Sequence, residues 1–298
     1  MGTKFVKYYE IGGIPFSVTT PFRYADSSPY SLFCVPPRDV AARYDFDLVP
    51  ELPEMPGDAS FEDAHNRIFK DGETIVRYVG FFSKGKILNP PTSIVRYRPH
   101  GDTFSVALRE YPDMPRNEAF IFRSLCLEHL IASHDGVILH SSYIATDRGA
   151  ILFTAPSGTG KSTQAELWRR HRAAEVVNGD CSVVRRGEDG FFAWGLPFNG
   201  TSGICRNKNI PLLAIVYLTQ HSENRITRLG GAAAMSALLE GSKVNMWDPE
   251  DGAALTRMFS SLISEVPVFR LDCLPDEGAV ECLEEALRGS IPIERMRL

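Results

Sequence analysis

The chain has 298 residues, which is long enough for two domains with separate hydrophobic cores. It is 44% hydrophobic and 23% charged, a composition typical of a globular protein. The net charge of −5 argues against a basic face that binds nucleic acid, so we expect no nucleic-acid partner.

Residues 1–115 predict a β-rich domain. The N-terminus, MGTKFVKYYE, has no apolar signal segment, and short alternating runs at 14–19, 74–82 and 103–108 predict strands of a mostly antiparallel sheet. Prolines, glycines and acids fill residues 49–63, which predicts a loop. No catalytic constellation is visible in this half of the chain.

The segment YPDMP at 111–115 predicts the end of this domain. Asn117 can cap a helix over 117–133, so the second domain is predicted to cover 116–298. It opens with strand-like runs at 137–145 and 150–154, and the turn Asp147-Arg148-Gly149 between them predicts a hairpin.

The run APSGTGKST at 155–163 follows this hairpin and precedes a predicted helix at 162–172. A glycine-rich loop between a strand and a helix cradles phosphates, because its backbone N–H groups and the helix dipole attract anions. Lys161 is expected to reach the β- and γ-phosphates of ATP, and Ser162 to bind Mg²⁺. Ala155 replaces the usual first glycine, which requires a negative φ there. The predicted nucleotide-binding residues are Ser157, Gly158, Thr159, Gly160, Lys161, Ser162 and Thr163.

Further strands are predicted at 175–178, 181–186, 190–194, 212–219 and 224–229, and helices at 231–239, 251–264 and 277–287. Only one helix interrupts about six successive strand candidates, whereas ordinary phosphate-loop proteins alternate strand and helix. The sheet should therefore be antiparallel or mixed, and the fold class is predicted to be α+β.

Three of these motifs together resemble a known family. LH at 139–140, the loop SGTGKS and VVNGD at 176–180 are similar to the catalytic domain of bacterial HPr serine kinase/phosphorylase, which has the phosphoenolpyruvate-carboxykinase-like P-loop fold. WGLPFNGTSG at 194–203 resembles a segment of the broader HPr-kinase-like group, which includes kinases linked to peptide-modification clusters. The resemblance covers residues 137–229.

The resemblance implies that Lys161 and Ser162 hold ATP and Mg²⁺, and that Asp180 lies near the metal or the acceptor hydroxyl. His140 matches the family's histidine on the strand before the loop. The family has two adjacent carboxylates after the helix, whereas this chain has Asp180 alone, and Ser141 stands where glycine is usual. The phosphorylase segment and the usual N-terminal domain are not found, so HPr is not implied as the substrate.

Each candidate residue also has a structural interpretation. Asp180 is a metal ligand or base, or else caps a turn. His140 orients the base, or is a hydrogen-bonded structural residue. Arg206 neutralises the transferred phosphoryl group, or belongs to a solvated charge cluster. Residues 195–203 form a lid over the nucleotide, or an irregular connection.

Together these residues predict an ATP- and Mg²⁺-dependent kinase that phosphorylates a hydroxyl, such as serine, of a peptide, protein or small molecule, with 1–115 recognising the acceptor. The alternatives are a phosphoenolpyruvate-carboxykinase-like enzyme and a nucleotide-responsive peptide-binding module without catalysis. Six cysteines without C-x-x-C spacing and the absence of a long apolar run predict a cytoplasmic protein with no membrane partner. The resemblance leaves a homo-oligomer open.

Overall fold

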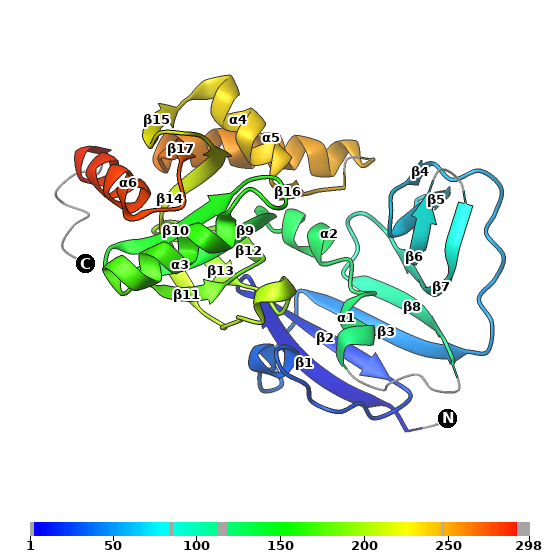
Figure 1. Ribbon diagram of the computed structural model, residues 1–298. Helices are drawn as coiled ribbons and strands as arrows, with labels where there is room; N and C mark the ends of the chain where they lie inside the picture. Colours follow the sequence, from blue (N-terminus) through cyan, green and yellow to red (C-terminus); the bar gives the residue numbers. More distant parts are fainter. Residues whose placement is uncertain (1–2, 84–85, 112–117, 246, 291–298) are drawn as a thin grey trace. The chain divides into compact units, whose positions relative to one another are not determined.

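The computed structural model describes residues 3–83, 86–111, 118–245 and 247–290 (Figure 1). The chain divides into two compact units, Met1–Leu130 and Ile131–Leu298. The predicted boundary between 115 and 116 and the predicted cap at Asn117 lie outside the described residues. Two sheets and six α-helices make up the described part, so the α+β class is confirmed. No helix in these four segments is long and apolar enough to cross a membrane.

The first unit contains an eight-stranded sheet in the order β1-β2-β3-β8-β7-β6-β5-β4. Its neighbours are antiparallel except for the pairs β2–β3 and β3–β8, so the prediction of a mostly antiparallel sheet is confirmed. Alternate residues of β8 are buried, because only one face of such a strand meets the core. The elements are β1 (Phe5–Ile11), β2 (Ile14–Thr20), η1 (Tyr30–Phe33), β3 (Ala42–Val49), β4 (Phe61–Glu62), β5 (Asn66–Asp71), β6 (Thr74–Ser83), β7 (Lys86–Tyr97) and β8 (Thr103–Arg109).

Two short helices, α1 (Glu118–Phe122) and α2 (Leu127–Ala132), replace the single helix predicted over 117–133. The prediction was wrong because Cys126 adopts a left-handed conformation, with φ of 48°, which an α-helix cannot accommodate. The fully buried Glu118 carboxylate accepts a 2.8 Å hydrogen bond from Tyr9 Oη and so ties α1 to β1.

The second unit contains a nine-stranded sheet in which β10–β14 and β14–β17 are parallel and the other pairs are antiparallel. The prediction of a mixed sheet is thus confirmed. A single α-helix interrupts the first seven strands, as predicted. The elements are β9 (Gly136–Thr146), β10 (Gly149–Thr154), α3 (Lys161–Arg172), β11 (Glu175–Asn178), β12 (Cys181–Gly187), β13 (Gly190–Gly195), η2 (Gly200–Ser202), β14 (Asn209–Gln220), β15 (Arg225–Leu229), α4 (Gly231–Glu240), β16 (Ser242–Lys243), α5 (Pro249–Glu265), β17 (Val268–Cys273) and α6 (Glu277–Ser290).

Helices cover both faces of the second sheet, so this unit has three layers (Figure 1). Successive residues of β10 point to opposite faces of the sheet and into different hydrophobic cores. Leu152 packs into the core formed with α4 and α5, whereas Ile151 and Phe153 pack into the core formed with α3 and α6. Because side chains alternate along a strand, both faces of β10 are buried and the whole strand is apolar.

Candidate active site

The site lies where β9 changes its partners on both sides. On one side, β12 pairs with residues 136–140 of β9 and β11 pairs with 143–145, so that Gly179 and Asp180 fall between the two partner strands. On the other side, β16 pairs with 138–139 and β10 pairs with 141–146. His140 stands at this change. The loop at 155–160, here called the phosphate loop, departs from the end of β10. That end is therefore adjacent to His140 and to the turn at 178–181, here called the Asp180 turn.

The loop before α3 has the backbone that the glycine pattern predicted. Gly158 and Gly160 have φ of 81° and 117°, conformations that glycine adopts without strain, and Gly160 immediately precedes α3. Ala155 keeps a negative φ, as its replacement of glycine requires. Because the space next to both glycines is open and Ser162 and Thr163 are exposed, the loop is accessible to a phosphate group.

Lys161 folds back onto the start of the loop. Its Nζ donates hydrogen bonds to Ala155 O at 3.0 Å and Pro156 O at 3.2 Å, and the residue is 7% exposed. Burial lowers the pKa of Lys161, and the nearby Asp180 and Cys181 oppose this shift. The ammonium group is thus hydrogen-bonded to the start of the loop and is under the electrostatic influence of Asp180.

The Asp180 turn is held by Asn178, which is fully buried. The Asn178 Oδ1 atom accepts hydrogen bonds from the backbone N–H groups of Asp180 at 2.8 Å and Cys181 at 3.0 Å. Its Nδ2 atom donates to Leu196 O at 2.8 Å and Phe198 O at 3.0 Å. One amide therefore fixes the Asp180 turn and joins it to the loop at 195–203.

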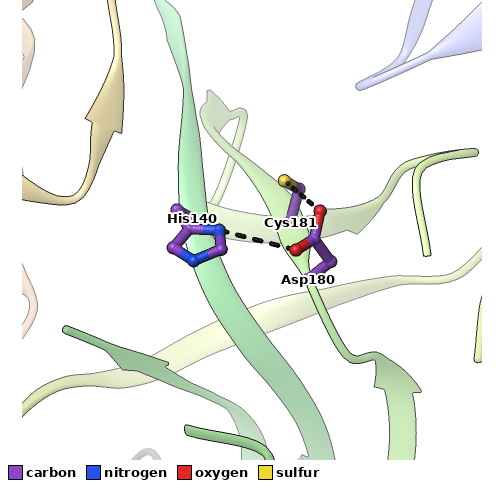
Figure 2. A group of neighbouring side chains, drawn as sticks. All are labelled: His140, Asp180 and Cys181. Atoms are coloured by element: carbon purple, nitrogen blue, oxygen red, sulfur yellow. Dashed lines mark hydrogen bonds and ion pairs between the residues drawn. The ribbon is translucent and has the colours of Figure 1, made fainter. Parts of the chain in front are cut away.

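The Asp180 carboxylate lies between His140 on β9 and Cys181 on β12 (Figure 2). Its Oδ1 atom is 3.6 Å from His140 Nδ1, and its Oδ2 atom accepts a 3.1 Å hydrogen bond from Cys181 Sγ. Lys243 Nζ donates in turn to Cys181 Sγ at 3.2 Å. The site therefore combines one carboxylate with an imidazole, a thiol and two ammonium groups.

The charges around His140 favour its neutral form. Burial lowers its pKa from the ordinary value of 6.5, and the positive charges of Lys161 and Lys243 lower it further, while Asp180 opposes them. At neutral pH the imidazole is uncharged and can accept or relay a hydrogen bond beside the Asp180 carboxylate.

His140, Asp180 and Cys181 bring three ligand atoms within 4.8 Å of one another, a spacing that a metal ion could use. Cysteine binds zinc as the thiolate, so this set of ligands requires Cys181 to lose its proton. Burial raises the pKa of Cys181 to about 12, and the Lys243 ammonium lies against its sulfur, where it would repel a dication. Asp180 and the Ser162 hydroxyl offer oxygen ligands, which Mg²⁺ prefers, and the predicted Mg²⁺ site at these two residues stays a prediction.

Among the described residues, Arg206 makes no hydrogen bond or ion pair with His140, Asp180 or Cys181. Its Nε atom pairs with Glu175 Oε1 at 2.9 Å, and Lys208 pairs with the same carboxylate. The Arg206 side chain is 55% exposed. The arrangement is that of a solvated charge cluster, and the predicted contact of Arg206 with a phosphoryl group stays a prediction.

The loop at 195–203 lies against the Asp180 turn. A Cβ atom on Gly179 would lie 2.2 Å from Ser202 Oγ, and one on Gly200 would lie 2.8 Å from Asp180 Oδ1. A Cβ atom at either position would therefore require the Ser202 or Asp180 side chain to move. The loop thus covers one side of Asp180, whereas its predicted contact with a nucleotide stays a prediction.

Sequence reasoning missed Asn178, Cys181 and Lys243. Asn178 and Cys181 flank the Gly179-Asp180 pair, so an Asn two residues before an Asp after a buried strand was an available signal for an Asx turn. Lys243 had no such signal, because a two-residue strand that follows a helix carries no periodic pattern.

No protein-family model matches the sequence, and no curated protein matches it. Among solved structures, the HPr(Ser) kinase/phosphatase from Coxiella burnetii is similar over 51% of this chain and 95% of its own chain, with 11% sequence identity and a TM-score of 0.31. At this TM-score the likeness carries no argument about chemistry, which rests on the geometry of the site itself.

Proposed function

We propose that this chain is an ATP- and Mg²⁺-dependent phosphotransferase that transfers the γ-phosphate to a hydroxyl group, with a catalytic unit of the phosphoenolpyruvate-carboxykinase-like P-loop fold. One observation carries the proposal: the phosphate loop leaves β10 beside His140 and the Asp180 turn, because β9 changes partners on both sides at that point. This adjacency supports a site that combines a phosphate-binding cradle with a candidate base.

The chain's residues fit the parts that phosphoryl transfer needs. The loop N–H groups and the first turn of α3 would hold the β- and γ-phosphates. Lys161 would exchange its two carbonyl partners for phosphate oxygens, which bind an ammonium group more strongly. Bound Mg²⁺, held by Ser162 and Asp180, would neutralise charge on the phosphates.

Transfer would then require one proton acceptor. The acceptor oxygen attacks the γ-phosphorus, its proton passes to the Asp180 carboxylate, and the bond from the γ-phosphorus to the β-phosphate oxygen breaks to release ADP. Neutral His140, 3.6 Å from Asp180 Oδ1, would orient that carboxylate. The Cys181 thiol fixes the second carboxylate oxygen by its hydrogen bond.

A nucleotide-responsive module without catalysis is the competing function, and the lack of a second carboxylate beside Asp180 favours it, since Gly179 and Cys181 flank that residue. Calorimetric titration with MgATP followed by mass spectrometry of serine peptides and small hydroxy compounds separates the two. A phosphotransferase binds MgATP and yields a phosphorylated product. Binding without a product across the panel would support the module, and no binding would refute both.

Two lysines of the second unit provide a test variant of the loop and its matched control. Lys161→Met should weaken MgATP binding by about 10- to 100-fold, whereas Lys208→Met should leave it unchanged, because Lys208 pairs with Glu175 rather than with the phosphate loop. Equal binding by the two variants would contradict the assignment of the loop.

A further inference from the structure

A cavity of about 360 Å³ lies in the second unit, at the end of β10 that is remote from the phosphate loop. The turn between β9 and β10, together with α3 and α6, forms its wall through Arg148, Trp168 and Leu287. The phosphate loop departs from the other end of β10, about 17 Å along the strand. None of the lining residues belongs to the candidate active site, so the cavity is a separate feature of this unit, and its volume is in the range of small-molecule sites.

Two hydrogen-bond donors of the lining residues have no acceptor. Trp168 is 4% exposed, and its Nε1 atom is buried without a hydrogen-bond partner in the described part of the chain. The Nη2 atom of Arg148 is likewise buried without a partner, and the described residues give its guanidinium group no ion pair. Buried donors are nearly always hydrogen-bonded, because an unsatisfied donor has lost its bond to water. An oxygen acceptor bound in the cavity would supply the missing bonds.

The charges on the wall favour a ligand with a single negative charge. Arg172 is already paired with Glu284 at 3.0 Å and with Glu277 at 3.3 Å, whereas Arg148 has no such partner among the described residues. Asp147 is exposed, so solvent screens its repulsion of an anion. One unpaired guanidinium group therefore matches one carboxylate, which forms stronger hydrogen bonds with arginine than a neutral carbonyl does.

The rest of the wall is mainly aliphatic, so it suits the body of a ligand rather than its charged end. These aliphatic residues are Ala145, Ile151, Ala174, Leu213 and Leu287. We propose that this cavity binds a small organic carboxylate, whose oxygens accept hydrogen bonds from Trp168 and Arg148 and whose apolar body contacts the aliphatic side chains. The inference does not depend on the proposed phosphotransferase function.

Titration of the ¹⁵N-labelled full-length protein tests the inference, because each of the three tryptophans gives one indole N–H signal in an NMR spectrum. Trp168→Phe identifies the Trp168 signal by its loss. The probes are phenylacetate, 3-phenylpropionate and hexanoate, each compared with its amide. We expect at least one carboxylate to move the Trp168 signal downfield and to bind about tenfold or more tightly than its amide. The Trp194 N–H is also buried without a partner but does not line the cavity, so its signal should stay in place.

Substitution assigns the preference for a carboxylate to Arg148. Arg148→Gln should weaken binding of that carboxylate about tenfold or more, whereas the control Arg170→Gln should not, because Arg170 pairs with Glu166 outside the cavity. An unmoved Trp194 signal in ligand-free Arg148→Gln shows that the unit is still folded. A Trp168 signal that no carboxylate moves, equal binding of the amides, or undiminished binding by Arg148→Gln would overturn the inference. ATP takes no part in these measurements, so such a failure would leave the proposed function standing.

Discussion

Replacement of Asn178 by alanine should release the Asp180 turn. The substitution removes four hydrogen bonds, two from the backbone N–H groups of Asp180 and Cys181 and two to the carbonyls of Leu196 and Phe198. Each such bond contributes about 0.5–1.5 kcal/mol. Because two of the four are only partly buried and water can replace them, we expect a loss of about 2–4 kcal/mol.

Hydrogen exchange measured by mass spectrometry reports this loss locally. Peptides that contain the Asp180 turn and the loop at 195–203 should lose about 30- to 1,000-fold of their protection, up to the limit set by global unfolding. Asn178→Asp tests the hydrogen bonds to the turn separately from those to the loop. It keeps an acceptor for the N–H groups of the turn but places a carboxylate against the loop carbonyls. Its loop should lose protection more than its turn.

The exposed Asn209 on β14 provides the control, and Asn209→Ala should leave exchange in both segments unchanged. Unchanged protection in Asn178→Ala would refute the reasoning, because it would show that the four bonds do not hold the turn. An equal loss of protection in the turn and the loop of Asn178→Asp would refute the assignment of Oδ1 to the turn and Nδ2 to the loop.

Three further outcomes follow from the site. Burial and the Lys161 charge lower the pKa of His140, so an NMR titration of the ligand-free protein should place its midpoint below 6.5, and Lys161→Met should raise that midpoint. The protonated form is therefore reached only at lower pH, and an unmoved midpoint would contradict the charge contribution. Lys161→Met should also weaken MgATP binding by about 10- to 100-fold in calorimetry. Gly200→Ala places a Cβ 2.8 Å from Asp180 Oδ1 and should lower the rate of transfer at least about tenfold. Gly203 also has a positive φ, but the space beside it is open, so the control Gly203→Ala should not lower the rate in this way. Equal rates for the two variants would show that the contact with Asp180 is unimportant.

Local patterns predicted the part of the second unit that surrounds the phosphate loop. The hairpin of β9 and β10, the loop and α3 follow one another within about 35 residues, and each has its own signal: alternating apolar runs, a turn, glycines and a helix. The strands β12 and β13 were predicted, at 181–186 and 190–194, for the same reason. These contacts are short-range, so the sequence order already places the residues side by side.

The parts that sequence reasoning missed depend on distant pairing. The strand β17 is a six-residue run between α5 and α6 that pairs in parallel with β14, and nothing nearby marks so short a buried run as a strand. Lys243 enters the site only because β16 pairs with β9, about a hundred residues earlier in the chain. Arg206 pairs with Glu175, at the far end of β11 from Asp180, and this ion pair between strands is likewise not visible in a local pattern.

The central claim is that Asp180 and the phosphate loop form one phosphoryl-transfer site. The most direct measurement compares the transfer of labelled γ-phosphate from ATP to serine peptides and small hydroxy compounds by the wild type, Asp180→Asn and the control Asp189→Asn, which alters an exposed hairpin residue. We expect label on an acceptor with the wild type and the control, and none with Asp180→Asn although it still binds ATP. Transfer at the wild-type rate by Asp180→Asn would contradict the account.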